Sequence, residues 1–497
     1  MAVNLDWKVI PAREQRLGSI TGYDGTLRDM AEQGCNGCLQ DKRRDFQTAS
    51  SCAHCHLINQ LAGLQGTAVV DHAPIGCVGS QVFFSSGRAR IEPPPGAPPM
   101  ENVRILTTGI NEPDTIFGAL DKLRDSVRLA YERHHPREIY ITTSCTSAVI
   151  GEDCESVAEE MTHELGIPVI VGTGEGLRSK IWASGFDAYC HAASLARLKG
   201  KEVTPKDKKR NTISYVGFAP TGRKYIAPLF ERIGLDLVCL TAGSSIEDFQ
   251  RAAESVATWG QCGAQSSYLC GVLEKEFGVK YFQSHLPYGG IGFERFFRDV
   301  ARYVGREEDA EAVLAEERAK YLPKIEKLLP RLKGTRVLVA MGASFAYEYT
   351  RMLGELGMIP IHTVAYHYDP KLDNLYEEEK VAAATDVFEL KLDVPTSVND
   401  AQQQETNLIT KQLNPDLVLS RAHEAGVMAQ LQGRPALDAQ IGLIVMGYRG
   451  LYRFAVLAHE ALQTNNMVRH LGARYVTPFT PEYENLEPFQ FYREEAI

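Results

Sequence analysis

Hydrophobic and polar positions repeat one order of strand, helix and strand three times along the chain. In the first repeat, PREIYITTSC from Pro136 is typical of a buried strand, GEDCESVAEEMTHELG of an amphipathic helix ended by Gly166, and IPVIVGT of the next strand. The same order returns at Thr212 (TISYVGFAP, RKYIAPLFERIG, LDLVCLT) and at Thr335 (TRVLVAMGAS, FAYEYTRMLGELG, MIPIHTVAY). The pattern predicts an α/β protein with three doubly wound, Rossmann-like domains built on parallel sheets.

The spacing of these repeats divides the chain into four parts. A length of 497 residues suits about three domains. We predict an N-terminal extension over residues 1–50, a first α/β domain over 51–210, a second over 211–333 and a third over 334–497. The proline run IEPPPGAPP marks a loop ahead of the first repeat, and the charge run near residues 307–332 predicts a solvated connecting helix.

The balance of charges excludes two classes of partner. The chain carries 53 Lys and Arg against 63 Asp and Glu, a formal net charge of -10, whereas nucleic-acid and anionic membrane binding need a clustered basic face. No stretch reaches the roughly 18 apolar residues of a membrane span, and residues 1–12 lack the apolar core of a signal peptide. We therefore expect a cytoplasmic protein that binds neither nucleic acid nor membrane.

The cysteines point to metal or redox chemistry. Eleven are many for a cytoplasmic chain, and an odd number does not suit a closed disulfide framework. Two C-x-x-C pairs, beginning at Cys35 and Cys52, together have the spacing of a zinc ribbon. Zinc would not explain Cys77 in the turn HAPIGCVGS, or Cys145 at a strand end, where doubly wound folds bind ligands. Iron-sulfur clusters use the same thiolates and draw them from distant loops.

Three of these thiols lie in phrases that resemble the component 1 proteins of the nitrogenase superfamily. The phrases are SSCAHCHLINQLAGLQGTAVVDHAPIGC, TTSCTSAVIGEDCESVAEEM and GTGEGLRS. Alpha-type subunits of that family place cluster cysteines ahead of a helix, in an H-G-P-x-G-C turn and in a T-x-C-x-x-x-x-I-G-D-D stretch. The resemblance extends from about residue 50 to GYRGLYRFAVLAHEALQTN. It implies that Cys52, Cys77 and Cys145 hold half of an [8Fe-7S] P-cluster, with the other half on a related beta-type subunit.

A fourth cysteine, Cys262 in WGQCGAQSSYLCGVLEKEFGVKYF, is similar to the single cysteine that anchors the large [8Fe-9S-C]-type cofactor in alpha-type subunits. Beta-type subunits usually lack it, so the resemblance implies an alpha-type chain. In the first cluster, Cys55 competes with Cys52 as the ligand. Three roles stay open for Cys35 and Cys38, which would flank that cluster, bind zinc or do neither. Packing is the commonest role for the cysteines within helix or strand patterns, namely Cys154, Cys190, Cys239 and Cys270.

The sequence departs from nitrogenase where the far end of the cofactor would bind. Nitrogenase uses a histidine there, but this chain has none between His423 and His459, and the loop after VLVAMG carries no arginine. These differences argue against dinitrogen reduction. The candidate pocket residues are His423 after the strand DLVLS, His367 in AYHYDP, and Trp182, which matches a glutamine near the nitrogenase cofactor. Each of the three also fits an ordinary loop or core position.

Altered ligation beside an apolar pocket fits the catalytic alpha-type subunit of methylthio-alkane reductase, a nitrogenase-like enzyme. The resemblance then implies that small thioethers, R-S-CH3, are cleaved with two electrons and two protons to methanethiol and an alkane or alkene. An ATP-dependent reductase with a [4Fe-4S] cluster would supply the electrons, since this chain has no G-x-x-x-x-G-K-[ST] loop. A beta-type subunit would complete an α2β2 assembly. The alternative is a scaffold on which a nitrogenase cofactor precursor matures, because such scaffolds also keep the anchoring cysteine and lack the distal histidine.

Overall fold

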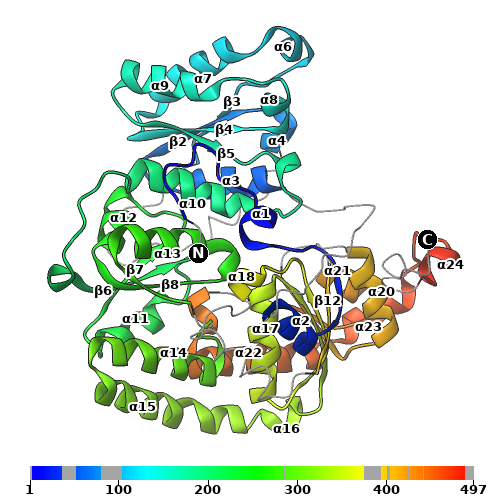
Figure 1. The fold of residues 1–497 in the computed structure, drawn as a ribbon. Coiled ribbons are helices and arrows are strands. Elements are labelled where there is room, and N and C mark those ends of the chain that lie inside the picture. Colours follow the sequence, from blue (N-terminus) through cyan, green and yellow to red (C-terminus); the bar gives the residue numbers. More distant parts are fainter. Residues whose placement is uncertain are drawn as a thin grey trace. The chain divides into compact units, whose positions relative to one another are not determined.

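The computed structural model describes residues 3–35, 52–79, 103–283, 286–373, 393–399, 403–421, 425–439 and 442–486. The chain forms two compact units, one of Met1–Arg16 with Ser51–Gln283 and the other of Leu17–Ser50 with Ser284–Ile497. The described strands build three sheets, two in the first unit and one in the second (Figure 1). The predicted fold class, with three doubly wound α/β parts on parallel sheets, is confirmed.

The first sheet is parallel throughout and has helices on both faces. Its strands, in spatial order, are β3 (Ile105–Thr107), β2 (Thr67–His72), β4 (Glu138–Thr143) and β5 (Val169–Thr173). Alternate residues of a strand face opposite sides: Val69 and Tyr140 pack with α3 (Ala53–Leu61) and α10 (Ser184–Arg197). Ala68 and Ile139 pack with α7 (Leu120–His134) and α9 (Cys154–Leu165) on the other face (Figure 1).

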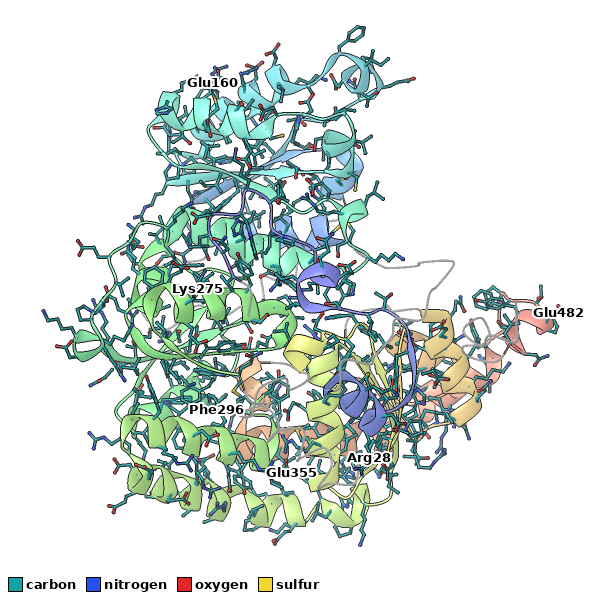
Figure 2. The ribbon with its side chains drawn as sticks, in the orientation of Figure 1. Arg28, Glu160, Lys275, Phe296, Glu355 and Glu482 are labelled. Atoms are coloured by element: carbon teal, nitrogen blue, oxygen red, sulfur yellow. The ribbon has the colours of Figure 1, made fainter. Side chains whose placement is uncertain are left out.

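Helix α9 shows how the sequence sets these boundaries. The side chain of Asp153 accepts a hydrogen bond from the backbone N–H of Ser156 at 3.1 Å and so caps the helix start. Gly166 ends the helix with φ 67°, a left-handed conformation that glycine adopts without steric cost. On the outer face, Glu160 accepts from Arg124 of α7 at 2.8 Å (Figure 2). The helix therefore ends at Gly166, as the sequence predicts, but it begins at Cys154, three residues inside the predicted segment, because Asp153 caps it.

The second sheet continues the core of the first. It is also parallel, in the order β7 (Asp236–Leu240), β6 (Arg210–Val216), β8 (Ser255–Gly260) and β9 (Lys280–Phe282). One buried cluster runs from α3 and α10 to α13 (Gly263–Phe277). The other helical segments in the described residues of the first unit are α4 (Ile75–Gly79), α6 (Glu112–Phe117), α8 (Cys145–Val149), η1 (Gly176–Arg178), η2 (Lys206–Lys208), α11 (Arg223–Glu231) and α12 (Ile246–Ala253).

The third sheet recruits a strand from the N-terminal region. Its order is β1 (Tyr23–Thr26), β12 (Pro395–Val398), β11 (Ile359–Ala365), β10 (Arg336–Met341), β13 (Leu417–Ser420) and β14 (Ala436–Asp438). Only β1 runs antiparallel among these strands, and it pairs with β12. Residues that we assigned to an N-terminal extension thus supply the edge of this sheet. The predicted domain boundaries, at residues 50, 210 and 333, stay a prediction.

Helices cover the third sheet and extend beyond it. Glu355 of α17 accepts hydrogen bonds from the backbone N–H groups of Gly290 and Ile291 at the start of α14, at 3.0 and 3.2 Å (Figure 2). No helix in the described ranges is long and apolar enough to cross a bilayer. Helix α1 (Arg13–Leu17) spans the boundary between the two units in the sequence. The helical segments in the described residues of the second unit are α2 (Leu27–Cys35), α14 (Gly289–Val304), α15 (Glu307–Glu326), α16 (Leu329–Leu332), α17 (Ala343–Glu355), α18 (Pro370–Asp373), α20 (Gln403–Leu413), α21 (Ala425–Leu431), η3 (Gly442–Val445), α22 (Gly447–Gln463), α23 (Asn466–Arg474) and α24 (Pro481–Glu484).

Candidate functional site

Four cysteines gather at the carboxyl edge of the first sheet. Cys77 lies in α4, directly after β2, and Cys145 begins α8, directly after β4. Cys52 is the N-cap residue of α3, and Cys55 lies in its first turn. Because the strands are parallel, the segments after them meet at one edge, where doubly wound folds bind ligands. We call these four residues the thiol group.

A glycine lets two members of the thiol group approach each other. Gly176 comes after β5, and a Cβ atom placed on it would lie 3.0 Å from the Cβ of Cys52 and 3.3 Å from its Sγ. The same atom would lie 3.7 Å from the Sγ of Cys145, so the two sulfurs are separated by no more than about 7 Å. A larger residue would push them apart.

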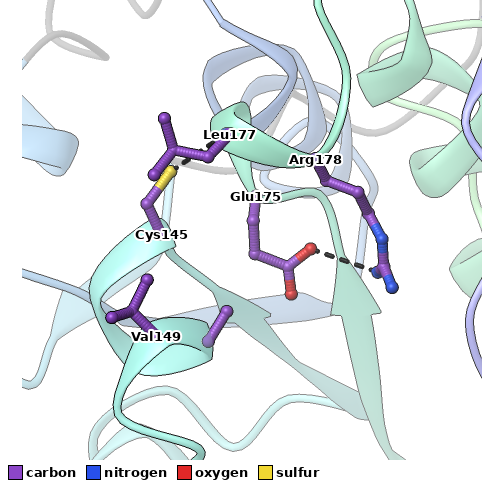
Figure 3. A pocket seen from close by; sticks show the side chains of 6 residues that line it. Cys145, Val149, Glu175, Leu177 and Arg178 are labelled. Atoms are coloured by element: carbon purple, nitrogen blue, oxygen red, sulfur yellow. Dashed lines mark hydrogen bonds and ion pairs between the residues drawn. The ribbon is translucent and has the colours of Figure 1, made fainter.

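The sulfur of Cys145 is held as a hydrogen-bond acceptor. The backbone N–H of Leu177 donates to it at 3.3 Å (Figure 3). Ser144 fixes the preceding backbone, because its hydroxyl accepts from the N–H of Ser147 at 3.2 Å and the Ser147 hydroxyl accepts from the N–H of Ser144 at 2.8 Å. Hydrogen bonds to sulfur are one means by which proteins tune iron-sulfur potentials.

The thiol group opens onto an apolar surface. A pocket of about 270 Å³ beside Cys145 is lined by Cys145, Ala148, Val149, Glu175, Leu177 and Arg178 (Figure 3). Three large apolar side chains around Cys77 and Cys145 are mostly exposed: Ile75 at 74%, Val149 at 77% and Leu177 at 81%. We call these three the apolar rim. Exposed apolar side chains grouped in this way are typical of a surface that another protein covers.

The donor set fits a multi-iron cluster better than a single metal ion. No three His, Cys, Asp or Glu side chains in the described part of the chain are close enough to hold one ion. The thiols are nevertheless within electrostatic reach of one another, since burial and then the charges of Asp71, Cys55 and Cys145 raise the pKa of Cys77 to about 11. A hydrogen bond to Cys55, together with burial, raises the pKa of Cys52. Bound iron would favour the thiolates.

A buried histidine and carboxylate lie beneath the thiol group. Nε2 of His54, between the two cysteines of α3, lies 2.8 Å from Oδ1 of Asp71 in β2. The hydroxyl of Thr142 in β4 donates to the same oxygen at 3.0 Å. Burial alone would lower the pKa of His54, but the hydrogen bond and charge of Asp71 raise it above its ordinary value. These contacts connect the start of α3 to β2 and β4, the strands that precede Cys77 and Cys145.

Cys262 occupies a different environment, inside the first unit. It is the N-cap residue of α13 and only 4% exposed, and its Sγ accepts from the backbone N–H of Gln265 at 3.4 Å. The positive end of a helix favours a thiolate. Three buried polar atoms close to it in sequence lack hydrogen-bond partners among the described residues: Nε2 of Gln261, Oε1 of Gln265 and Oγ of Ser267. A thiolate anchor near a spare amide N–H of Gln261 and a spare hydroxyl of Ser267 fits a cofactor that has sulfur acceptors, because both groups can donate.

Trp182 lies in an aromatic cluster beside the start of α13. Its ring is 4.7 Å from the ring of His56, and Phe186 lies 5.3 Å from Phe218, centre to centre. Trp182, Phe218 and Ala264 pack together around a buried core of Ile181, Ala183 and Phe186. Ala264 is two residues beyond Cys262, so the structure brings Trp182 into the neighbourhood of the cofactor candidate. Its assignment as a pocket residue stays a prediction.

The two histidine candidates belong to the second unit. His367 comes after β11, is 1% exposed, and its Nε2 lies 3.3 Å from Oδ2 of Asp369. The hydroxyl of Ser19 donates to the other oxygen of Asp369. These contacts suit a histidine that stabilises a turn, although its assignment to the pocket is not tested by them. His423 lies outside the described residues, and so does Cys38; Cys35 ends α2.

The remaining cysteines pack as expected. Cys154, Cys190 and Cys270 are 3%, 0% and 0% exposed, and burial raises the pKa of Cys154 and Cys270 to about 12. Cys239 is partly buried in β7. Cysteines that pack within helices and strands usually serve as small apolar residues.

Sequence reasoning missed three contributors to the thiol group. Gly176 and Leu177 received no role of their own, although their phrase GTGEGLRS contains the end of a strand and the residues that follow it. Asp71 was not singled out. A carboxylate at the end of the otherwise apolar strand TAVVDH was the available signal, since a buried charge needs a partner.

Comparisons with known proteins place the chain in a family and show its fold. The family Nitrogenase component 1 type Oxidoreductase matches residues 52–463. The nitrogenase molybdenum-iron protein alpha chain of Methanosarcina barkeri is 30% identical over 302 residues, which cover 58% of this chain and 54%, about half, of that protein. The nitrogenase iron-molybdenum cofactor biosynthesis protein NifE of Methanococcus maripaludis is 25% identical over 435 residues, 86% of each chain.

A solved structure, Nitrogenase Cp1 at pH 6.5, has the same fold. It matches with a TM-score of 0.71 and 18% identity, covering 93% of this chain and 96% of that one. The family match begins at Cys52 and includes the whole thiol group as well as Cys262. Because it also spans most of the chain, the protein belongs to the nitrogenase component 1 type oxidoreductase family.

Proposed function

We propose that this chain is an alpha-type subunit that holds a large iron-sulfur cofactor on Cys262 while the cofactor matures, and that it pairs with a beta-type subunit across the thiol group. The observation that carries the proposal is the presence of two separate thiol sites in one unit. One is open and surrounded by the apolar rim, and the other is buried at a helix start. An open site suits sharing between subunits, and a buried one suits a cofactor shielded from water.

At the open site, Cys52, Cys77 and Cys145 would hold the cluster, an [8Fe-7S] P-cluster by resemblance. Bound there, the cluster would store and pass single electrons. The chain's own residues set its position: Gly176 allows Cys52 and Cys145 to converge, and the N–H of Leu177 orients the sulfur of Cys145. Burial of the apolar rim by the beta-type subunit would exclude water from the cluster.

At the buried site, Cys262 would hold one end of an [8Fe-9S-C]-type cofactor. The helix α13 and the N–H of Gln265 stabilise the charge on its sulfur. Nε2 of Gln261 would donate a hydrogen bond to the cofactor, because its Oε1 already accepts from Tyr215 at 2.9 Å and from the N–H of Phe218 at 3.0 Å. Those two bonds fix the direction of the amide.

Two observations support maturation over dinitrogen reduction. Cofactor biosynthesis proteins from two Methanococcus maripaludis sources match 86% and 92% of this chain, at 25% and 24% identity. The chain also has no histidine between His423 and His459 to fix the far end of a cofactor. A cofactor held by a single protein ligand is easier to hand on, since fewer bonds must break.

A second candidate function is the cleavage of small thioethers, and the aromatic cluster favours it. Trp182, Phe186 and Phe218 present an apolar wall beside the start of α13, which suits an apolar substrate such as R-S-CH3. With 2-methylthioethanol, two electrons and two protons would give ethylene, methanethiol and water. An ATP-dependent [4Fe-4S] reductase would supply the electrons.

One experiment separates the two functions. The chain is purified anaerobically with its beta-type partner, and its iron is quantified. One sample is then mixed with a nitrogenase component 1 that lacks its cofactor, together with the reductase, ATP, a strong reductant and acetylene. A second sample receives the same reductase, ATP and reductant, but 2-methylthioethanol in place of component 1 and acetylene. Maturation predicts that acetylene reduction appears in the first mixture and no ethylene in the second. Ethylene and methanethiol that depend on ATP would instead establish thioether cleavage. Iron-loaded protein inactive in both assays would contradict both proposals.

A further inference from the structure

The thiol group contains one more cysteine than the proposed cluster needs. In the proposed function, Cys52, Cys77 and Cys145 bind the cluster. Cys55, in the first turn of α3, is not among these ligands. It is 8% exposed, whereas Cys52 is only partly buried. The fourth thiol therefore calls for a separate explanation.

Cys55 faces Cys52 at close range. The two Sγ atoms are 3.7 Å apart, and the thiol of Cys52 donates toward the sulfur of Cys55. A disulfide bond is about 2.05 Å long, so the sulfurs must approach by less than 2 Å. Rotation about the side-chain bonds supplies such a movement. The sulfur of Cys145 is also near Cys52, but a Cβ atom placed on Gly176 would lie close to both sulfurs.

The pair also has the position of a redox-active C-x-x-C motif. Cys52 is the N-cap of the nine-residue helix α3, with φ -118° and ψ 173°, and Cys55 lies in the first turn. A C-x-x-C pair at a helix start can form a disulfide by thiol–disulfide exchange, in which each attacking thiol loses its proton.

We propose that Cys52 and Cys55 form a reversible disulfide that removes Cys52 from the cluster site until the pair is reduced. The inference rests on the proposed function, because it takes Cys52 as a cluster ligand. The oxidant is a small-molecule disulfide, R-S-S-R. The more exposed Cys52 attacks it and releases one R-SH, and Cys55 then attacks the mixed disulfide and releases the second. Two thiols are oxidised and one disulfide is reduced to two thiols.

The disulfide and the cluster exclude each other chemically. The sulfur of Cys52 cannot bind iron as a thiolate while it is bonded to Cys55. Oxidised chain would therefore accept no complete cluster, and reduction would restore the site without resynthesis of the protein. The Cys52–Cys55 disulfide would form before the beta-type subunit covers the apolar rim, because the small disulfide must be able to reach Cys52.

The first test maps the bond in the full chain. Iron is removed with a chelator under argon, and the chain is equilibrated with oxidised or reduced glutathione and then alkylated. Trypsin releases one peptide, residues 45–88, that contains Cys52, Cys55 and Cys77. Fragmentation should place a reversible loss of two hydrogens between Cys52 and Cys55. Cys77→Ser should retain this bond and Cys55→Ser should lose it. A bond to Cys77, or none at all, would overturn the proposal.

The second test measures iron uptake by the same chain in the presence of its beta-type partner. Oxidised wild-type chain should take up at least about tenfold less iron than reduced chain while carrying no glutathione on Cys52, whereas oxidised Cys55→Ser should be blocked only by a glutathione that stays bound to Cys52. Equal loading of oxidised and reduced wild type would refute the gating role. A reduced wild type that takes up no iron would instead refute the proposed cluster site, and the peptide map would still decide whether the disulfide forms.

Discussion

The two units share an architecture but differ in the residues that come directly after their strands. In the first unit, the segments after β2 and β4 carry Cys77 and Cys145, and the segment after β8 carries Cys262. In the second unit, the segment after β11 carries His367, which is paired with Asp369. A parallel sheet provides the same edge in both cases, so the fold alone does not decide the chemistry. Thiols at that edge make the first unit the place where metal is expected.

The largest expected effect is on the open site of the first unit. Cys145→Ala should abolish the iron of the thiol group and weaken pairing with the beta-type subunit, because the cluster would lose a ligand and metal binding is coupled to folding and assembly. Metal analysis and size-exclusion chromatography measure both. Cys154→Ala is the matched control, since Cys154 is buried in α9 away from the pocket. Unchanged iron and assembly size in Cys145→Ala would refute the assignment.

The buried site should respond separately. Cys262→Ala should lose the iron of the large cofactor while keeping that of the thiol group, because the two sites share no ligand. Cys270→Ala, on the same helix and 0% exposed, controls for disturbance of α13. Electron paramagnetic resonance and iron counts distinguish the two pools. If Cys262→Ala retains both pools, the cofactor is anchored elsewhere in the chain.

The second unit should lose stability in acid through one buried histidine. Burial lowers the pKa of His362 in β11 to about 4, below its ordinary value of 6.5. The unfolded chain binds a proton as pH falls below 6.5, whereas the folded chain does not until about pH 4, so stability is lost across that window. The full loss is about 3 kcal/mol. His362→Gln, which keeps a hydrogen-bonding group near Ser397, should remove the dependence.

Hydrogen exchange across residues 359–365 measures this loss after correction for intrinsic rates. Tryptophan fluorescence serves as the internal control, because Trp7, Trp182 and Trp259 all belong to the first unit. Equal acid sensitivity in wild type and His362→Gln would contradict the assignment of the effect to His362.

The smallest expected effect concerns the apolar rim. Leu177→Asp places a charge where a partner would bury an apolar side chain, and should weaken binding of the beta-type subunit by about 10- to 100-fold, or roughly 1.4 to 2.7 kcal/mol. Titration of the purified subunits measures the dissociation constant. Val203→Asp is the control, because Val203 is also exposed in the first unit but lies outside the pocket. Equal affinity of both variants would remove Leu177 from the interface.

The helix predicted as a charged, solvated connector shows where sequence patterns fall short. The region around residues 307–332 has charged residues in nearly every turn, yet α15 buries Ala310, Val313 and Leu314. Its partners are α14 and α22, the latter more than a hundred residues further along the chain. A long amphipathic helix and a solvated one differ only in whether a distant segment covers the apolar stripe.

The sequence by itself determined the three strand–helix–strand units, the end of α9 at Gly166, and the cysteines that lie just after strands. These features depend on periodicity, caps and glycines, which act over a few residues. Tertiary structure decided that β1 joins the third sheet, that Gly176 brings Cys52 and Cys145 together, and that Asp71 lies against His54. Such contacts depend on how segments distant in sequence pack, and no local pattern encodes that distance.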